Sequence, residues 1–400
     1  MIETTHKSLA ERRADVDHLR VGALLLLIVY HVLLVFDTGD WWRVKSEHAG
    51  VWADFIIGAL TPWRMALVFF IGGIAARFMF EKQSSGGFVR DRALKLLTAF
   101  VFAIIVLAPM QRFVRLDAHA ADAGNYLNYL VFHAPFAVSY HGIWLPDFAH
   151  AWFLPYLFAY SVGAVAFWRF ASRHYLQVQR VLERTPVGLI IAAVMAWFAV
   201  IEIFVAPAHP VSGIIFTDIT AHLKFAPIFL FGTFVAKSCV FRSNLVDSRW
   251  VLWPLALALL TLSLYLQGVT PPHLGVLPPA EMLATRGLYG GAMLFAVAAF
   301  GEWALNRPSA ALTYATDAIL PVYLMHQTVL VIVADQIVFH HWPLATELAV
   351  LFASASLIPL FIYHVVVRHT PWLRVLFGLR PAAPTRAPQA LDPTQELAKA

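Results

Sequence analysis

Residues 19–36 read LRVGALLLLIVYHVLLVF, a run long enough to cross the hydrocarbon core of a membrane as one helix. A charged segment precedes the run and no small-residue cleavage site follows it, so we interpret it as a retained anchor and not as a signal peptide. Hydrophobic residues make up 60% of the 400-residue chain and charged residues only 13%, about half the charged share of a soluble domain. This composition excludes a secreted disulfide scaffold, a nucleic-acid-binding domain and a disordered chain, and it predicts a polytopic membrane protein.

Nine further apolar runs of similar length follow the first. The pattern predicts an all-α membrane protein with about ten transmembrane helices, at 19–36, 63–80, 93–109, 148–168, 187–205, 225–241, 251–267, 288–305, 319–338 and 347–367. The longest gap, 110–147, is interpreted as an ordered external loop with a surface helix. The chain then divides into a cytoplasmic segment 1–18, a ten-helix domain 19–367 and a cytoplasmic tail 368–400, which is predicted to be disordered from Gly378 onward.

Lys and Arg residues are distributed unevenly between alternate gaps. With the N-terminus inside, the inner segments hold 18 of these residues and the outer segments hold 6. Cytoplasmic loops of membrane proteins carry such an excess, so the distribution predicts that both termini lie in the cytoplasm. An even number of spans agrees with this prediction.

Ionisable side chains inside the apolar runs are the default candidates for function, because they are costly to place in lipid. Several of them, including Arg77 and Glu202, lie near a predicted helix end, where snorkelling to the headgroups is favoured over a functional role. Glu302 and Asp335 have no partner that the sequence identifies.

Arg20 and His31 lie eleven positions apart in the first run. Eleven residues make about three helical turns, so both side chains leave the helix on one face, about 16 Å apart along its axis. A cavity along this face would combine a cation at the inner mouth with a neutral imidazole in the outer half, and such an imidazole suits a general base. The spacing leaves open the alternative that Arg20 pairs with Asp17 as a headgroup anchor while His31 bonds a neighbouring helix.

Three more cations accompany this pair. Arg64 opens the second run near the outer face, at a depth close to that of His31, and the following Gly72-Gly73 pair allows a helix or a ligand to approach closely. Arg92 and Lys95 share a helix face at the inner mouth. They either bind phosphate groups or reflect the ordinary excess of positive charge in the cytoplasm.

Four short segments follow one another along the chain. They are Arg20-x10-His31, WRMALVFFIGG at 63–73, WFL at 152–154 and VYLMH at 322–326. In their order and spacing they resemble the acyltransferase 3 integral membrane proteins, and especially the branch of glucans biosynthesis protein C. Lys95 departs from the Arg-x-x-Arg pattern of that family, which keeps the charge but loses the bidentate fork of arginine.

The resemblance implies O-acyl transfer in the bacterial cytoplasmic (inner) membrane. The donor would be a cytoplasmic acyl-CoA, either acetyl-CoA or succinyl-CoA, and the acceptor a hydroxyl group of a periplasmic or cell-surface glycan. His31 would act as general base, while Arg20, Arg92 and Lys95 would hold the phosphate groups of CoA. The partners are then the lipid bilayer and the glycan, with no nucleic acid.

Four residues are candidates for substrate binding. Arg64 would bind a succinyl carboxylate or stabilise the oxyanion. Trp152 would stack on a sugar ring, although a place in the interfacial aromatic belt is favoured for it. Tyr323 and His326, one turn apart, are either a second group in the cavity or, for His326, a satisfied hydrogen-bond partner between helices.

Two other classes of function stay open. A transporter or glycan flippase would use Arg20 and His31 as a proton or substrate path, but the chain shows no internal repeat or matched pair of broken helices of the kind found in many transporters. A scaffold for glycan synthesis would tolerate the loss of both residues. No metal is expected, because there is no His-Glu-x-x-His pattern and Cys239 is the only cysteine.

Overall fold

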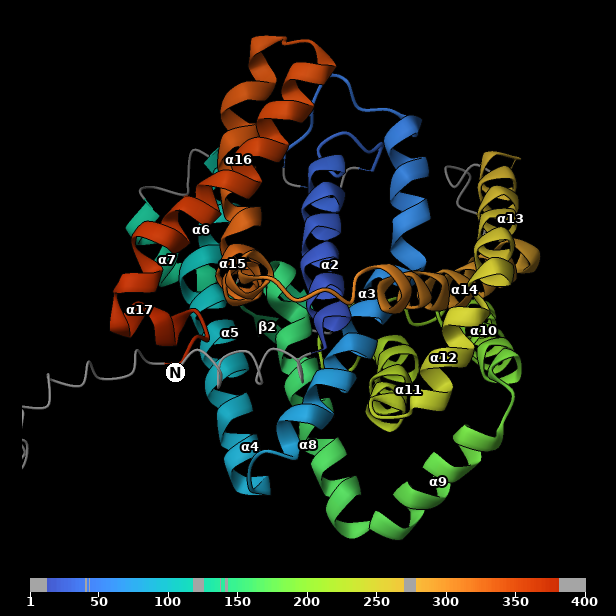
Figure 1. Ribbon diagram of the computed structural model, residues 1–400. Coiled ribbons are helices and arrows are strands. Elements are labelled where there is room, and N and C mark those ends of the chain that lie inside the picture. Colours follow the sequence, from blue (N-terminus) through green and yellow to red (C-terminus); the bar gives the residue numbers. More distant parts are fainter. Residues whose placement is uncertain are drawn as a thin grey trace, which may run out of the picture.

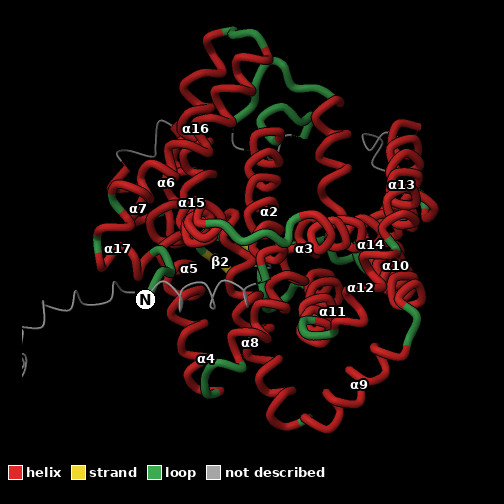
Figure 2. Tube along the Cα trace, in the orientation of Figure 1, coloured by secondary structure: helices red, strands yellow, loops and turns green. Residues whose placement is uncertain are grey.

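Long apolar helices form most of the part of the chain that the structure describes (Figures 1 and 2). The computed structural model describes residues 13–39, 42, 44–117, 126–136, 138–140, 143–269 and 278–380. Within these residues nine helical segments are long and apolar enough to cross a membrane: α2 (Ala14–Leu33), α3 (Val51–Phe80), Ser85–Val114, Ala149–Phe170, α10 (Val187–Phe204), Arg249–Gly268, α14 (Ala280–Ala304), Ala310–His340 and Leu344–His369. The predicted all-α membrane class is confirmed.

Some of these segments contain more than one element. The third joins α4 (Ser85–Arg92), the π-helix η1 (Ala93–Leu97), α5 (Thr98–Phe102), the π-helix η2 (Ala103–Leu107) and α6 (Ala108–Asp117). Three others pair a long helix with a short 3₁₀ segment: η4 (Ala149–Trp152) with α8 (Phe153–Phe170), α15 (Ala310–Ile337) with η6 (Val338–His340), and α16 (Leu344–Val365) with η7 (Val367–His369). The segment Arg249–Gly268 is the single helix α13 (Arg249–Val269). Single π-turns are frequent at functional sites, and η1 carries Lys95.

Short elements connect the long helices. They are α7 (Tyr126–Phe132), η3 (Ala134–Phe136), the antiparallel strands β1 (Val138–Tyr140) and β2 (Ile143–Leu145), α9 (Ser172–Arg184) and α17 (Pro371–Leu376). The gap at 110–147 does contain a short helix, α7, as predicted. The predicted disordered tail lies outside the described residues from position 381 onward.

The predicted span at 225–241 is not one continuous helix in the structure. Helix α11 (Ile219–Val235) and helix α12 (Cys239–Asp247) occupy this region, and their axes differ by 111°. The Ser238 side chain accepts a hydrogen bond from the Phe241 amide and so caps a new helix at this point. The described residues therefore contain nine candidate spans, or ten if the bent pair is one span.

Helix α3 begins at Val51, well before the predicted start at 63, because the residues before Pro62 are also apolar. Proline is tolerated inside this helix, as it is in many membrane helices. Arg64 therefore lies near the middle of a 30-residue helix, which corrects its predicted place at the outer end of a span.

Helix α2 lies in the middle of the molecule and packs against α3 on one side and against α15 on the other (Figure 1). Helices α3 and α11 cross closely at a pair of glycines: a Cβ atom on Gly73 would lie 2.0 Å from the Phe229 carbonyl oxygen, and one on Gly232 would lie 2.3 Å from the Phe70 carbonyl oxygen. The close approach predicted for the Gly72-Gly73 pair is thus a helix contact at Gly73.

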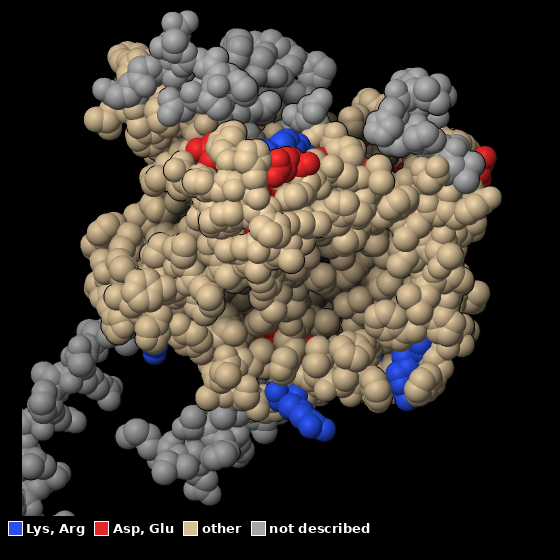
Figure 3. Space-filling view, turned by 90° about the horizontal axis from the view of Figure 1, so that it is seen from above, with Lys and Arg blue, Asp and Glu red and all other residues tan. Residues whose placement is uncertain are grey.

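The outer helices present apolar side chains. Only 11% of the apolar window of Arg249–Gly268 is buried, against 72% for Ala310–His340. Among the described residues, charged side chains are sparse on the face shown in Figure 3. Lipid is the surrounding that such a surface requires.

Candidate functional site

Three histidines from distant parts of the chain meet where α2, η4 and α15 come together. The His31 Nδ1 and His326 Nε2 atoms are 2.8 Å apart, and the two rings are stacked with centroids 5.0 Å apart. The His150 ring centroid lies 5.1 Å from that of His326 and 6.3 Å from that of His31. Packing of α2 against α15 brings His31 and His326 together.

The hydrogen bonds of this cluster assign the proton positions of the neutral rings. His326 donates its Nδ1–H to the Tyr323 carbonyl oxygen, so its Nε2 atom is an acceptor. His31 must then donate its Nδ1–H to His326, which leaves a lone pair on His31 Nε2. His31 Nε2 has no hydrogen-bond partner among the described residues. This is the nitrogen that a general base requires.

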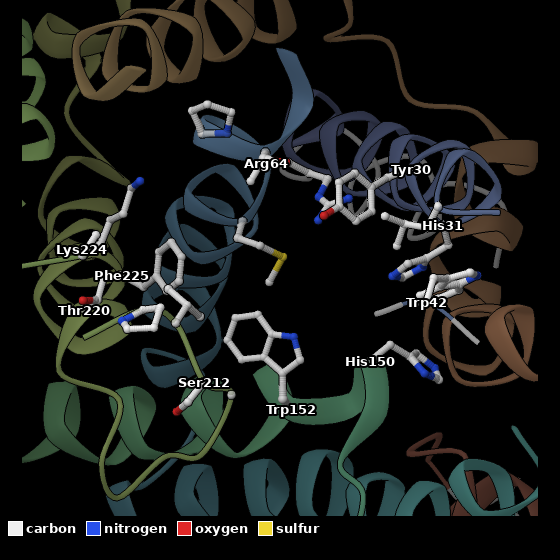
Figure 4. A pocket seen from close by; sticks show the side chains of 18 of the residues that line it. Tyr30, His31, Trp42, Arg64, His150, Trp152, Ser212, Thr220, Lys224 and Phe225 are labelled. Carbon is white, nitrogen blue, oxygen red and sulfur yellow. The ribbon is translucent and has the colours of Figure 1, made fainter. Parts of the chain in front are cut away.

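His31 lines a cavity of about 790 Å³ within the helix bundle (Figure 4). His150 and Trp152 from η4, and Arg64 from α3, line the same cavity. The Trp42 ring stacks on the His31 ring, with centroids 5.7 Å apart and an interplanar angle of 10°. His31 therefore stands on an aromatic wall at one side of the space.

Arg64 brings a cation next to His31. Its guanidinium carbon lies 3.4 Å from the centroid of the Tyr30 ring, a cation–π contact. The residue is 7% exposed, and its Nε and Nη1 atoms are buried without a hydrogen-bond partner among the described residues. A guanidinium in this state has donors available for an oxyanion or a carboxylate.

Tyr323 and His326 lie behind His31 and are not among the described residues that line the cavity. His326 is completely buried. The Tyr323 hydroxyl donates a hydrogen bond to the His150 carbonyl oxygen, and His150 Nε2 lies 3.0 Å from the Tyr323 carbonyl oxygen. Of the two roles open to His326, the hydrogen bond between helices is the one that the contacts display.

Arg20, Arg92 and Lys95 form a separate cationic cluster. Arg20 and Arg92 both act electrostatically on Lys95. Arg92 is 7% exposed, and its Nε and Nη2 atoms have no hydrogen-bond partner among the described residues. Arg20 also forms an ion pair with Asp17, at 3.4 Å, as in the alternative interpretation. None of the three cations is among the described residues lining the cavity beside His31.

Sequence reasoning missed part of the site. His150 lies in the one-turn 3₁₀ segment η4 at the start of the predicted span 148–168, and it was not singled out because polar residues are common at the ends of spans. The snorkelling interpretation of Glu202 is wrong, because this carboxylate is buried and lies 2.6 Å from the Lys224 ammonium group. Lys224 was hidden because the predicted helix began one residue after it.

Glu302 and Asp335, for which the sequence identified no partner, both have one in the structure. Glu302 forms ion pairs with Arg13, at 2.6 Å, and with Arg242. Asp335 accepts a hydrogen bond from the Gln336 side chain at 3.0 Å. Arg77, for which snorkelling was favoured, lies over the rings of Trp168 and Tyr175.

The fold and the cavity define a polytopic helical membrane protein with a polar site enclosed by its helices. A family model described as an acyltransferase domain matches residues 13–364, which is most of the chain. The protein therefore belongs to the acyltransferase 3 domain family, which indicates acyltransferase activity. Comparisons with curated proteins and with solved structures gave no match.

Proposed function

We propose that this protein is an O-acyltransferase of the bacterial inner membrane that moves an acetyl or succinyl group from cytoplasmic acyl-CoA to a hydroxyl group of a periplasmic or cell-surface glycan. The observation that carries the proposal is the pairing of His31 with Arg64 at one cavity wall. His31 has a free Nε2 lone pair, and Arg64 has guanidinium donors without partners among the described residues. A base beside an oxyanion site is the arrangement that acyl transfer needs.

The reaction follows from these two groups. His31 Nε2 takes the proton of the acceptor hydroxyl as its oxygen attacks the thioester carbonyl carbon. The negative charge that develops on the carbonyl oxygen is stabilised by Arg64. The C–S bond then breaks, the acyl group stays on the acceptor oxygen as an ester, and the departing CoA thiolate receives the proton from His31.

His326 acts through His31 in this proposal. Its buried Nε2 atom accepts the hydrogen bond from His31 Nδ1 and so keeps the other ring nitrogen of His31 unprotonated. His326 is thus a positioning residue, and the same holds for Tyr323, which supports His150 from behind.

The cationic cluster of Arg20, Arg92 and Lys95 is suited to binding the acyl-CoA donor. Arg92 is buried with free donors, and Arg20 and Lys95 add charge beside it. Phosphate groups are strong acceptors for such a cluster, so we assign it the phosphates of CoA. The pantetheine arm would then reach from these cations toward His31.

A transporter or glycan flippase is the second candidate, and one observation favours it. The bent pair α11 and α12 is a broken helix, a feature that many transporters use at their binding sites. CoA release separates the two candidates, because a transporter would not convert acyl-CoA to free CoA when glycan is supplied.

The test is glycan analysis by mass spectrometry in cells that lack the protein and are complemented with wild type or with His31→Ala. We expect an ester-linked mass that returns with wild type only, because loss of a general base lowers the rate by about 10²- to 10⁴-fold. His340→Ala, at an exposed position in η6, is the matched control and should restore the ester. Normal esterification by a correctly inserted His31→Ala protein would refute the proposed mechanism.

A further inference from the structure

A second charged group lies at the wall of the cavity opposite His31. Lys224 of α11 lies at the far side of this space from His31 in Figure 4. Its Nζ atom is 2.6 Å from the Glu202 Oε1 atom of α10. Arg286 of α14 approaches the same carboxylate, with its Nε atom 3.7 Å from Glu202 Oε2. Three helices thus place two cations around one carboxylate.

The charges lining the cavity do not balance. Four cationic side chains and two carboxylates are among the described lining residues, which leaves a net charge of +2 when the histidines are neutral. Asp147 lies 3.7 Å from Arg112, and Glu202 is bonded to Lys224. The two remaining cations are Arg64 beside His31 and Arg286 at the opposite wall.

Arg286 has unused donor capacity. Its Nε atom is buried and has no hydrogen-bond partner among the described residues, because 3.7 Å is too long for a hydrogen bond to Glu202. The Arg286 side chain as a whole is 39% exposed, so its guanidinium is open to the cavity. An anionic group of a ligand would supply the acceptor that its Nε–H lacks among the described residues.

Hydrogen bonds fix the part of the cavity wall that lies between His31 and Lys224. The buried Asp218 carboxylate accepts hydrogen bonds from the Ser212 and Gly213 amides, at 3.1 and 2.9 Å, and from the Tyr156 hydroxyl, at 2.9 Å. Gly213 has a φ of +73° and packs against the Trp152 side chain. Trp152 lies between the His31 side and the Lys224 side of the cavity (Figure 4). An aromatic surface of this kind suits a sugar ring.

We propose that Arg286 and Lys224 bind an anionic group, a carboxylate or a phosphate, that belongs to the acceptor glycan. The proposal rests on the proposed function, in which the acceptor hydroxyl approaches His31. Arg64, beside His31, stabilises the reacting carbonyl oxygen in the proposed mechanism. Arg286, the other cation without a balancing carboxylate, lies at the opposite wall and is available to a part of the acceptor glycan away from the reacting hydroxyl. The charge distribution along the sequence also predicts an outer location for both residues, on the side from which a glycan enters.

The test uses the purified full chain in phosphatidylcholine nanodiscs with two probes: a neutral glucan oligosaccharide, and the same oligosaccharide with its terminal sugar oxidised to a uronic acid. With wild type and acyl-CoA we expect a KM about tenfold lower for the acidic probe, the size of one favourable charge-assisted contact. Arg286→Gln should abolish this preference and leave turnover of the neutral probe unchanged. Glu202 keeps Lys224 as its partner in this variant, which protects the fold.

Arg249→Gln is the matched control. Its guanidinium lies over the Trp250 and Trp303 rings and is not among the described residues lining the cavity, so the preference for the acidic probe should persist. Equal KM values for the two probes in wild type, or a preference that survives Arg286→Gln, would overturn the inference while the acyl transfer itself stands.

Equilibrium binding of the acidic probe without acyl-CoA separates the two proposals. Binding that depends on Arg286, in a protein that transfers no acyl group to either probe, would support the site and refute the proposed function. Nanodiscs that contain phosphatidylglycerol test a lipid phosphate as the source of the anion. If this lipid removes the preference in wild type and has no effect on Arg286→Gln, a headgroup occupies the site and the assignment to the acceptor is overturned.

Discussion

A single hydrogen bond decides which ring nitrogen of His31 carries the proton. His326 donates its Nδ1–H to the Tyr323 carbonyl oxygen, and its Nε2 atom accepts a hydrogen bond from His31 Nδ1–H. In an apolar interior an unsatisfied donor is costly, so the two rings lock each other into one tautomer. In the proposed mechanism His326, which does not line the cavity among the described residues, therefore controls the basicity of His31, which does.

Replacing His326 by Phe should lower kcat for acyl transfer by about 10- to 100-fold, which corresponds to the loss of one hydrogen bond of 1.5–3 kcal/mol. The KM for acyl-CoA should stay unchanged, because His326 lies away from the cationic cluster. His326→Gln should recover part of the rate, since its amide oxygen can accept from His31 Nδ1.

His364→Phe is the control for this prediction. His364 bonds the Tyr314 hydroxyl on another part of the bundle and is not among the described residues of the cavity wall, so its variant should keep full activity. Equal losses in the Phe and Gln variants of His326 would argue against a role in setting the tautomer.

The sequence predicted His31 correctly as a buried polar group, because a histidine inside an apolar run is conspicuous. It could not identify His150 or Lys224, because each stands at the border of a run, where polar residues are common. Their burial depends on where neighbouring helices lie, and no local pattern carries that information.

Helices α3 and α11 cross where neither can carry a side chain. Gly73→Ala would place a Cβ atom 2.0 Å from the Phe229 carbonyl oxygen, so one helix must move away. We expect the variant to lose about 1–3 kcal/mol of stability, as overpacked cores do, measured by reversible denaturation in detergent. The shift should also lower activity, because α3 carries Arg64.

Gly22→Ala provides the comparison. A Cβ atom at Gly22 of α2 would meet no atom within 4 Å, so this variant should be as stable as wild type or slightly more so. If the Gly73 and Gly22 variants denatured alike, the close crossing of α3 and α11 would be in error.

The break in the helix predicted at 225–241 has a local cause that the sequence pattern did not reveal. Hydropathy averages over about 20 residues, so the polar Lys237 and Ser238 in the bend between α11 and α12 are outweighed by the apolar residues on either side. The Ser238 cap that begins α12 is a single-residue feature within a long apolar run, so an average over that run does not detect it. The length and composition of a run therefore predict that a helix is present more securely than they predict its direction.

The whole molecule has an orientation that can be tested with its only cysteine. Cys239 is exposed at the start of α12, close to the predicted inner end of its span. The excess of positive charge in the inner segments predicts that this end faces the cytoplasm. A membrane-impermeant maleimide should thus label Cys239 in permeabilised cells and leave it unlabelled in intact spheroplasts.

Thr217→Cys in a Cys239→Ser background is the opposite case. Thr217 is exposed in the loop before α11, on the predicted outer side, and should react in intact spheroplasts. Labelling of Cys239 in intact spheroplasts would contradict the predicted topology and the proposed direction of acyl transfer.

The apolar runs determined that this chain is a bundle of membrane helices, because any segment of that length and composition is more stable in lipid than in water. The polar residues inside those runs, His31 and Arg64 above all, marked the wall of the cavity. Only the packing of the helices decided that His326 backs His31, that Lys224 and Glu202 pair, and that Arg286 is left with unused donors. These contacts join residues far apart in sequence, and their energies depend on which helices become neighbours, a property of the whole bundle that no single helix contains.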